Sequence, residues 1–128
     1  MSLEGKVAVV TGAGRGIGRA IALAYARHGA AVGCVARTRA DIQRTTAEIV
    51  KAGGRALAIA ADVRDRQAVE EAFNEVSRQF GGLDIVVINA GGNRSHEPVE
   101  GSDAELWRET IETNLIGAYT ALARPFRI

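Results

Sequence analysis

The chain has 128 residues, of which 47% are hydrophobic and 24% charged, an ordinary composition for one globular domain with its own core. Its formal net charge is +1 and its acidic and basic residues are interspersed, which excludes a strongly basic face for nucleic acid or anionic membranes. We therefore expect small-molecule partners, no nucleic acid and no membrane. Because neither a leader pattern nor a stretch of about eighteen apolar residues occurs, the expected location is cytoplasmic.

The first predicted element is an apolar strand that runs into a glycine-rich turn. Residues 7–10 are VAVV, which is typical of a strand buried on both faces of a parallel sheet. The segment TGAGRGIG follows, with Gly12, Gly16 and Gly18 in the spacing G-x-x-x-G-x-G, and a helical pattern begins there. Such glycines let bare backbone N–H groups at a helix N-terminus face a pyrophosphate. The spacing is not the common G-x-G-x-x-G, but its place between strand and helix indicates a dinucleotide site.

A helix and a second strand are predicted next. Gly29 supplies the C-terminal stop of the helix, and residues 30–36 form the strand. This strand holds the only cysteine, Cys34, which we interpret as a buried structural thiol, and one cysteine gives no disulfide framework. The apolar positions at helical spacing are Ile17, Ala20, Ile21, Ala24 and Tyr25.

The second predicted helix begins after Thr38, a residue type that is favoured at N-caps. Its apolar positions are Ile42, Ile49 and Val50, and two glycines at positions 53 and 54 end it. Residues 56–61 then form the third strand.

Asp65 is the predicted N-cap of a third helix, which the glycines at positions 81 and 82 end. Residues 85–88 follow as the fourth strand. The predicted inward face of the helix consists of Val69, Ala72, Phe73, Val76 and Phe80.

This alternation of strands and helices predicts an α/β fold. Strands of continuous apolar character joined by crossover helices need a parallel sheet that is covered on both faces, with right-handed connections. The class is therefore doubly wound. Neither a repeat nor a linker interrupts residues 1–128, so we expect one domain. A capping-box pattern at residues 102–105 opens a further helical stretch.

Four features, in order along the chain, resemble the short-chain dehydrogenase/reductase family. They are TGAGRGIG at residues 11–18, the pair Asp62-Val63 after the third strand, Asn89-Ala90-Gly91 after the fourth strand, and Asn114 within TNLIGAY. They span nearly the whole chain but only the cofactor-binding half of a usual family domain. The resemblance implies a Rossmann-like sheet of strand order 3-2-1-4 that is truncated after about four strands.

The resemblance also implies roles for these residues. In the family, the glycine loop holds the pyrophosphate, and a carboxylate at the position of Asp62 accepts a hydrogen bond from the adenine amino group. The segment from Asn89 would border the nicotinamide and stabilise the central strand, and Asn114 would be catalytic by holding a water of the proton relay. No metal site is expected. The implied cofactor-binding residues are Thr11, Gly12, Gly14, Arg15, Gly16, Ile17, Gly18, Arg37, Asp62, Val63, Asn89, Ala90 and Gly91.

Each of these polar residues has a structural alternative. Asp62 could cap a turn before Asp65. Asn89 could be a turn former, and Asn114 a solvated residue or the site of a kink. The ordered set favours the functional interpretation. His96, in a glycine-rich polar loop without a named partner, is predicted to be inert.

Two arginines bear on the choice of cofactor. Enzymes that use NAD place an acid at the end of the second strand for the ribose hydroxyls, whereas a 2′-phosphate needs cations there. Here the strand ends in Ala36, Arg37 follows at once, and Arg15 stands in the glycine loop. This pattern predicts NADP rather than NAD. The alternative is that Arg15, Arg37 and Arg39 are ordinary surface charges.

The family's catalytic tyrosine and lysine, four residues apart, do not occur in this sequence. Its lysines are Lys6 and Lys51, and the residues four positions after Tyr25 and Tyr119 are glycine and alanine. Three hypotheses remain: the N-terminal part of an NADP-dependent oxidoreductase acting on an alcohol or ketone, a non-catalytic dinucleotide-binding module that pairs with a homologue, and a non-functional truncation product. The isolated chain is predicted to be inactive. We expect it to act on a small-molecule substrate only if the rest of the family domain completes it.

A sheet truncated after four strands would leave residues 84–90 at an edge. That segment is apolar and unbroken, and its unpaired backbone groups would invite another chain. We therefore expect homo-oligomers or aggregation.

Overall fold

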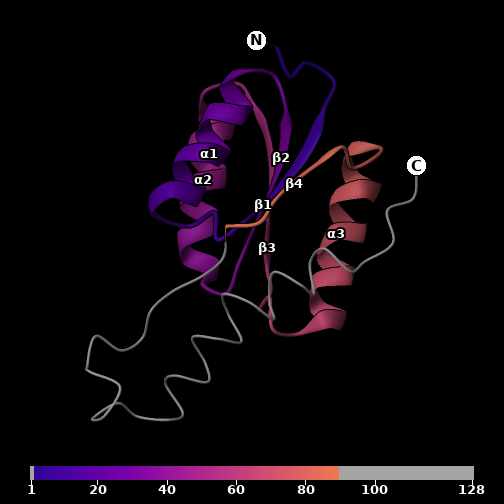
Figure 1. Ribbon diagram of the computed structural model, residues 1–128. Coiled ribbons are helices and arrows are strands. Elements are labelled where there is room, and N and C mark those ends of the chain that lie inside the picture. Colours follow the sequence, from indigo (N-terminus) through magenta and orange to yellow (C-terminus); the bar gives the residue numbers. More distant parts are fainter. Residues whose placement is uncertain (1, 90–128) are drawn as a thin grey trace.

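The computed structural model describes residues 2–89 as a parallel four-stranded sheet of order β3-β2-β1-β4 with three helices. Helices α1 and α2 cover one face of the sheet and α3 covers the other (Figure 1). This arrangement confirms the α/β, doubly wound class and the strand order. The elements are β1 (Val7–Thr11), α1 (Gly16–Arg27), β2 (Ala31–Ala36), α2 (Arg39–Lys51), β3 (Arg55–Ala60), α3 (Arg66–Phe80) and β4 (Ile85–Val87).

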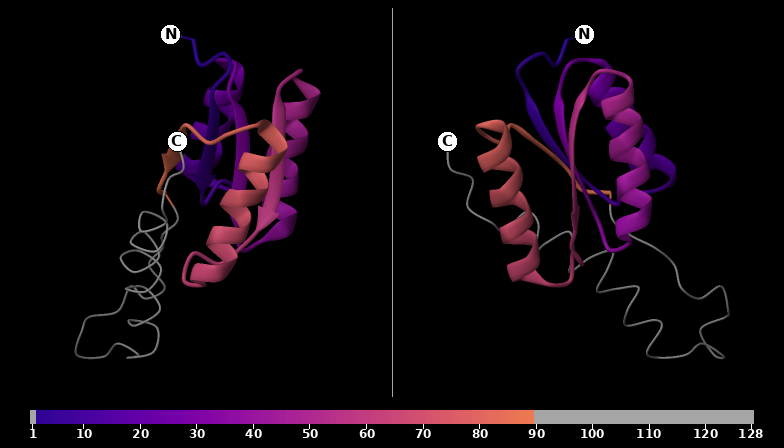
Figure 2. Two further views of the ribbon diagram at one scale, coloured as in Figure 1. Left: turned by 90° about the vertical axis from the view of Figure 1, so that its right-hand side faces the viewer. Right: turned by 180° about the vertical axis from the view of Figure 1, so that it is seen from behind.

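The parallel register brings the carboxyl ends of all four strands to one edge of the sheet. Strand β1 pairs with β2 from Val7↔Ala31 to Thr11↔Val35, and with β4 from Ala8↔Ile85 to Val10↔Val87. Strand β2 pairs in turn with β3. Figure 2 shows the same two-sided cover of the sheet from the side and from behind. The loops after β1, β2 and β3 therefore emerge close together, where open parallel sheets bind ligands.

Both faces of β1 and β2 are buried, as the continuous apolar runs predict. Alternate residues of a strand point to opposite faces of the sheet, so both strands contribute side chains to the same two core clusters, one on each face. Val7, Val9, Ala31, Val35 and residues of α3 form one cluster. The other, between the sheet and helices α1 and α2, includes Val10, Val32, Cys34, Ile42 and Ile49.

Gly33 lets α3 approach the centre of the sheet. A Cβ atom at this position in β2 would lie 2.4 Å from Cγ2 of Val76. Val76 is fully buried and occupies the space that a side chain on residue 33 would need. The glycine therefore sets how closely α3 packs against the sheet.

The predicted apolar stripe of α1 is wrong at its first positions. Ile17 is 73% exposed, Ala20 is also exposed, and the fully buried residues of α1 are Gly18 and Ala22. The reason is the close approach of the helix to the glycine loop, since only small residues fit on the side that faces the loop and the sheet. Apolar spacing alone does not show how closely the helix approaches the loop.

Helix α2 also departs from its prediction. Val50 is 54% exposed, and the buried positions are Ile42, Thr45 and Ile49, which lie on one face at helical spacing. Thr38 occupies the N-cap position, but its side chain makes no capping hydrogen bond.

Helix α3 follows its prediction closely. The Asp65 carboxylate accepts a hydrogen bond from the backbone N–H of Ala68 at 3.2 Å, and Gly81 ends the helix in the left-handed conformation at φ +83°. Phe80 is only partly buried, while the other four predicted inward residues are buried. The observed bounds of each strand differ from the predicted bounds by one residue at one or both ends.

Cys34 is fully buried, and this burial raises the pKa of its thiol to about 11. Both its burial and its raised pKa fit the interpretation of Cys34 as a buried structural thiol. Across residues 2–89, the helices are too short or too polar to cross a membrane.

Candidate dinucleotide-binding site

The glycine loop between β1 and α1 needs two left-handed backbone conformations. Gly12 has φ +68° and Gly16 has φ +56°, values that residues with a side chain adopt only with strain. The Gly12 N–H donates a hydrogen bond to the Val35 carbonyl at 2.8 Å, which extends the pairing of β1 with β2 into the loop. A Cβ on Gly16 would meet no atom within 4 Å, so conformation and not crowding favours glycine there.

Gly18 is required for a different reason. A Cβ at this position would lie 2.1 Å from the carbonyl oxygen of Gly12 and 2.4 Å from Nδ2 of Asn89. The first turn of α1 therefore packs directly on the loop backbone. This contact fixes the helix N-terminus, with its unpaired N–H groups and positive dipole end, beside the loop.

Helix α2 supports the loop from the side. The buried Thr45 hydroxyl donates to the Ala13 carbonyl at 3.0 Å, and a Cβ on Gly14 would lie 2.7 Å from Cβ of Asp41. Neither Thr45 nor Asp41 was among the predicted site residues. The available signal for Thr45 was a hydroxyl on the same helical face as Ile42 and Ile49.

Thr11 and Asn89 join the ends of β1 and β4. The Thr11 hydroxyl accepts the Asn89 backbone N–H at 3.0 Å and donates to the Val87 carbonyl at 3.4 Å. The Asn89 side-chain amide donates to the Gly12 carbonyl at 3.4 Å. Asn89 thus connects the end of β4 to the glycine loop.

A cavity of about 220 Å³ opens at this edge of the sheet. It brings together seven of the predicted residues and four that were not predicted as site residues: Ala36, Thr38, Asp41 and Ala61. Thr11, Gly16, Ile17 and Gly18 belong to β1 or to the start of α1 and do not line the cavity. Ala90, Gly91, His96 and Asn114 lie outside the described residues. The predicted residues in the lining are Gly12, Gly14, Arg15, Arg37, Asp62, Val63 and Asn89.

Asp62 is held by its neighbour Arg64. The carboxylate accepts from the Arg64 backbone N–H at 2.9 Å and from Nη2 of its guanidinium at 2.7 Å. These side-chain hydrogen bonds are the main reason why the pKa of Asp62 lies below its ordinary value, although partial burial opposes them. The backbone contact is the local turn that the structural alternative anticipated, and the ionised carboxylate still faces the cavity.

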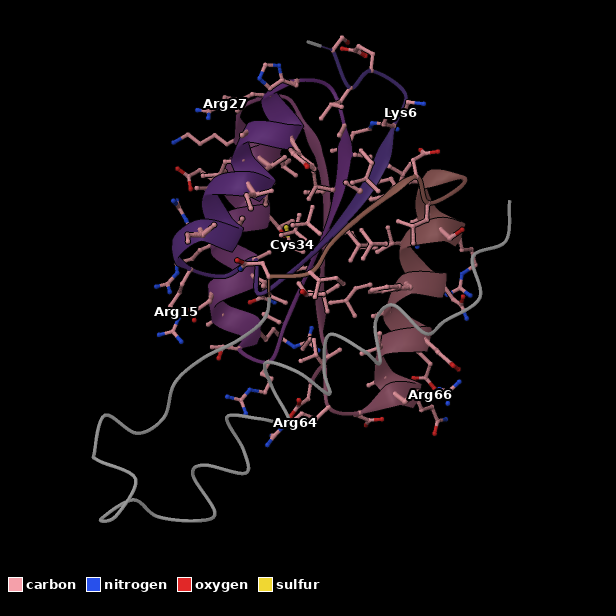
Figure 3. The ribbon with its side chains drawn as sticks, in the orientation of Figure 1. Lys6, Arg15, Arg27, Cys34, Arg64 and Arg66 are labelled. Carbon is pink, nitrogen blue, oxygen red and sulfur yellow. The ribbon has the colours of Figure 1, made fainter. Side chains whose placement is uncertain are left out.

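The two arginines that bear on cofactor choice both line the cavity. Arg15 is 84% exposed in its side chain, with Nε 3.6 Å from a carboxylate oxygen of Asp41. Arg37 is 48% exposed, with Nη1 4.0 Å from Asp62. Figure 3 shows Arg15 and Arg64 toward one end of the sheet, and Lys6 and Arg27 toward the other. The cavity lining therefore holds two arginines, each paired with a carboxylate, and Ala36 leaves the end of β2 itself without an acid.

Comparison with known proteins gives one family. Residues 6–126 match the family model described as short chain dehydrogenase. General stress protein 39 of Bacillus subtilis (strain 168) is 36% identical over 118 residues, which are 91% of this chain. The matched part is 41% of that relative, so the chain spans less than half of its length.

Solved structures agree with the fold. A metagenomic short-chain oxidoreductase in complex with NADP has a TM-score of 0.87 at 38% identity, over 95% of this chain and 55% of that one. An NAD⁺-bound xylitol dehydrogenase has a TM-score of 0.91 at 31% identity, over 95% of this chain and 47% of that one. Relatives of this fold thus include proteins that bind either dinucleotide.

Proposed function

Because this chain belongs to the short-chain dehydrogenase family, we propose that it forms the NADP(H)-binding part of an oxidoreductase. The family assignment supports a nicotinamide dinucleotide as the cofactor. The reaction we propose for the complete enzyme is hydride transfer between that nicotinamide and an alcohol or ketone.

The preference for the phosphorylated cofactor depends on one observation, the position of Arg37. It directly follows the neutral Ala36 at the end of β2, and both residues line the cavity. A guanidinium offers a planar fork that matches a phosphate, and no carboxylate at position 36 competes with the phosphate or repels it. Arg15 approaches the same cavity from the glycine loop. An NADP complex among the solved relatives is consistent with this preference.

Each remaining residue has a proposed part in binding. The N–H groups at the start of α1 would receive the pyrophosphate, since Gly16 leaves the space above the loop open. Asp62 would accept from the adenine amino group, with Val63 beside it, and Asn89 would hold the nicotinamide side of the cavity. Ala90, Gly91 and the proton-relay role of Asn114 remain proposals from the family resemblance.

Binding without turnover is the activity that we propose for residues 1–128. No tyrosine in this sequence is followed four positions later by a lysine, so the family's proton donor and its pKa-lowering partner are not supplied. The same observation favours a second candidate function, a non-catalytic dinucleotide-binding module that pairs with a homologue. A third possibility, a polypeptide without function, would bind no dinucleotide.

Self-association is a further proposal for this polypeptide. Within residues 2–89, β4 pairs with β1 alone, and its sequence is Ile-Val-Val. An apolar edge strand presents backbone donors and acceptors to another chain. Sedimentation velocity of the 128-residue polypeptide is expected to give species larger than a monomer, and a single monomer peak would contradict the proposal.

The compartment that we propose is the cytoplasm. Cys34 is free and buried, and a single cysteine cannot form an intrachain disulfide. Proteins of reducing compartments typically lack disulfides.

Titration calorimetry of the 128-residue chain with NADPH and NADH tests the cofactor proposal. The chain is expected to bind NADPH more tightly, and Arg37→Asp is expected to weaken NADPH binding by at least about tenfold relative to NADH. Arg27→Asp makes the same charge reversal at the other end of the sheet and is the matched control (Figure 3). Equal affinities for NADPH in wild type and Arg37→Asp would refute the preference, and no binding of either dinucleotide would refute the proposed function.

A further inference from the structure

Each arginine in the cavity lining shares its carboxylate with a second arginine outside the lining. Arg15 lies 3.6 Å from Oδ2 of Asp41, while Arg44, one helical turn further along α2, hydrogen-bonds to Oδ1 of the same carboxylate. The Asp41 side chain is only 16% exposed, whereas both of its arginine partners are largely exposed.

The same pattern recurs on the other side of the cavity. Arg37 lies 4.0 Å from Oδ2 of Asp62, while Arg64 binds both carboxylate oxygens, the shorter contact being 2.7 Å. At each carboxylate, the arginine outside the lining is hydrogen-bonded to it. The arginine in the lining has only a longer ion pair with the same carboxylate.

This sharing has an electrostatic consequence for an anion. A phosphate that pairs with Arg15 must draw the guanidinium from Asp41, and a carboxylate left without a partner would repel the phosphate nearby. Arg44 remains on Asp41 when Arg15 is drawn away. Arg64 has the same relation to Asp62 when Arg37 is drawn away.

We propose that Arg44 and Arg64 are positioning residues for the 2′-phosphate, because they keep the two cavity carboxylates neutralised while Arg15 and Arg37 pair with the anion. Neither Arg44 nor Arg64 lines the cavity, so their effect acts through Asp41 and Asp62. This inference rests on the proposed NADP(H) function and extends it to residues outside the cavity.

Adenosine 2′,5′-bisphosphate and adenosine 5′-monophosphate are the probes, titrated calorimetrically into the 128-residue chain at low ionic strength. Arg44→Gln is expected to weaken bisphosphate binding about threefold, the scale of an exposed ion pair, and to leave monophosphate binding unchanged. Arg78→Gln is the matched control, because Arg78 pairs with Glu75 at the same i,i+3 spacing and is 71% exposed, against 74% for Arg44.

A double-mutant cycle separates this role from simple attraction between Arg44 and the phosphate. In the Asp41→Asn background, Arg44→Gln is expected to have no effect on bisphosphate affinity, because no carboxylate remains to be neutralised. An equal loss in both backgrounds, or a loss no larger than that of Arg78→Gln, would overturn the inference while the proposed function stands. If the wild-type chain bound the bisphosphate no more tightly than the monophosphate, the NADP(H) proposal itself would fail, and this inference with it.

Discussion

The backbone N–H of Asn89 donates a 3.0 Å hydrogen bond to the hydroxyl of Thr11, across 78 positions of sequence. The same hydroxyl donates to the Val87 carbonyl, so one side chain at the end of β1 satisfies two backbone groups at the end of β4. Thr11 is 1% exposed, and loss of its hydroxyl would leave two partly buried backbone groups without this partner.

Replacing Thr11 with valine keeps the shape of the side chain and removes its hydroxyl. We expect Thr11→Val to lower the free energy of unfolding by about 1–2 kcal/mol, because two backbone groups at the end of β4 lose their hydroxyl partner. Urea denaturation followed by circular dichroism measures the change. Thr38→Val, at an exposed position whose hydroxyl makes no capping bond, is the control and should be nearly neutral. Equal stabilities for both variants would show that the Thr11 contacts contribute little.

Gly18→Ala tests the contact between α1 and the loop. An added methyl group would meet the Gly12 carbonyl oxygen at 2.1 Å, so the helix or the loop must move. We expect a loss of about 1–3 kcal/mol in the free energy of unfolding and weaker NADPH binding, because the helix N-terminus is displaced. Ala20→Ser, at an exposed position of the same helix, controls for a small change in α1. Unchanged stability and affinity in Gly18→Ala would contradict the packing described here.

Local signals in the sequence predicted the parts of the fold that depend on neighbouring residues. Asp65 was identified as a cap because its partner, Ala68, is three residues away, and the stop at Gly81 follows from the left-handed conformation that glycine favours. The exposure of Ile17 and Val50 was missed because apolar spacing does not say how closely a helix approaches the sheet.

The candidate site was predicted in part. The glycines, Arg37 and Asp62 follow strand ends in a recognisable order, and the parallel sheet brings them together. Asp41 was not predicted as a site residue, although it lines the cavity and pairs with Arg15. Thr45 was missed because its partner, the Ala13 carbonyl, is 32 positions away, and no local pattern specifies such a contact.

The pKa of Asp62 gives a prediction for acid stability. Because this pKa is lowered in the folded chain, chiefly by Arg64, the ionised carboxylate stabilises the fold above its ordinary pKa of 3.8. That contribution is lost as the pH falls from about the ordinary value through the lower folded value. Asp62→Asn should therefore be less stable than wild type at pH 7, and the difference should shrink below about pH 4. Urea denaturation at a series of pH values measures it, and a difference independent of pH would contradict the Asp62–Arg64 pair as its cause.

The Cys34 thiol should react with thiol reagents only when the chain opens. It is fully buried between the sheet and helices α1 and α2, and its pKa of about 11 keeps it protonated at pH 8. Since the thiolate is the nucleophile, both burial and protonation suppress the reaction. A disulfide reagent added at pH 8 is expected to label the native chain slowly and the urea-unfolded chain rapidly, with NADPH slowing the native reaction further if binding stabilises the fold. Equally fast labelling of native and unfolded chain would show that β2 is accessible. The burial of β2 on both faces of the sheet would then be wrong.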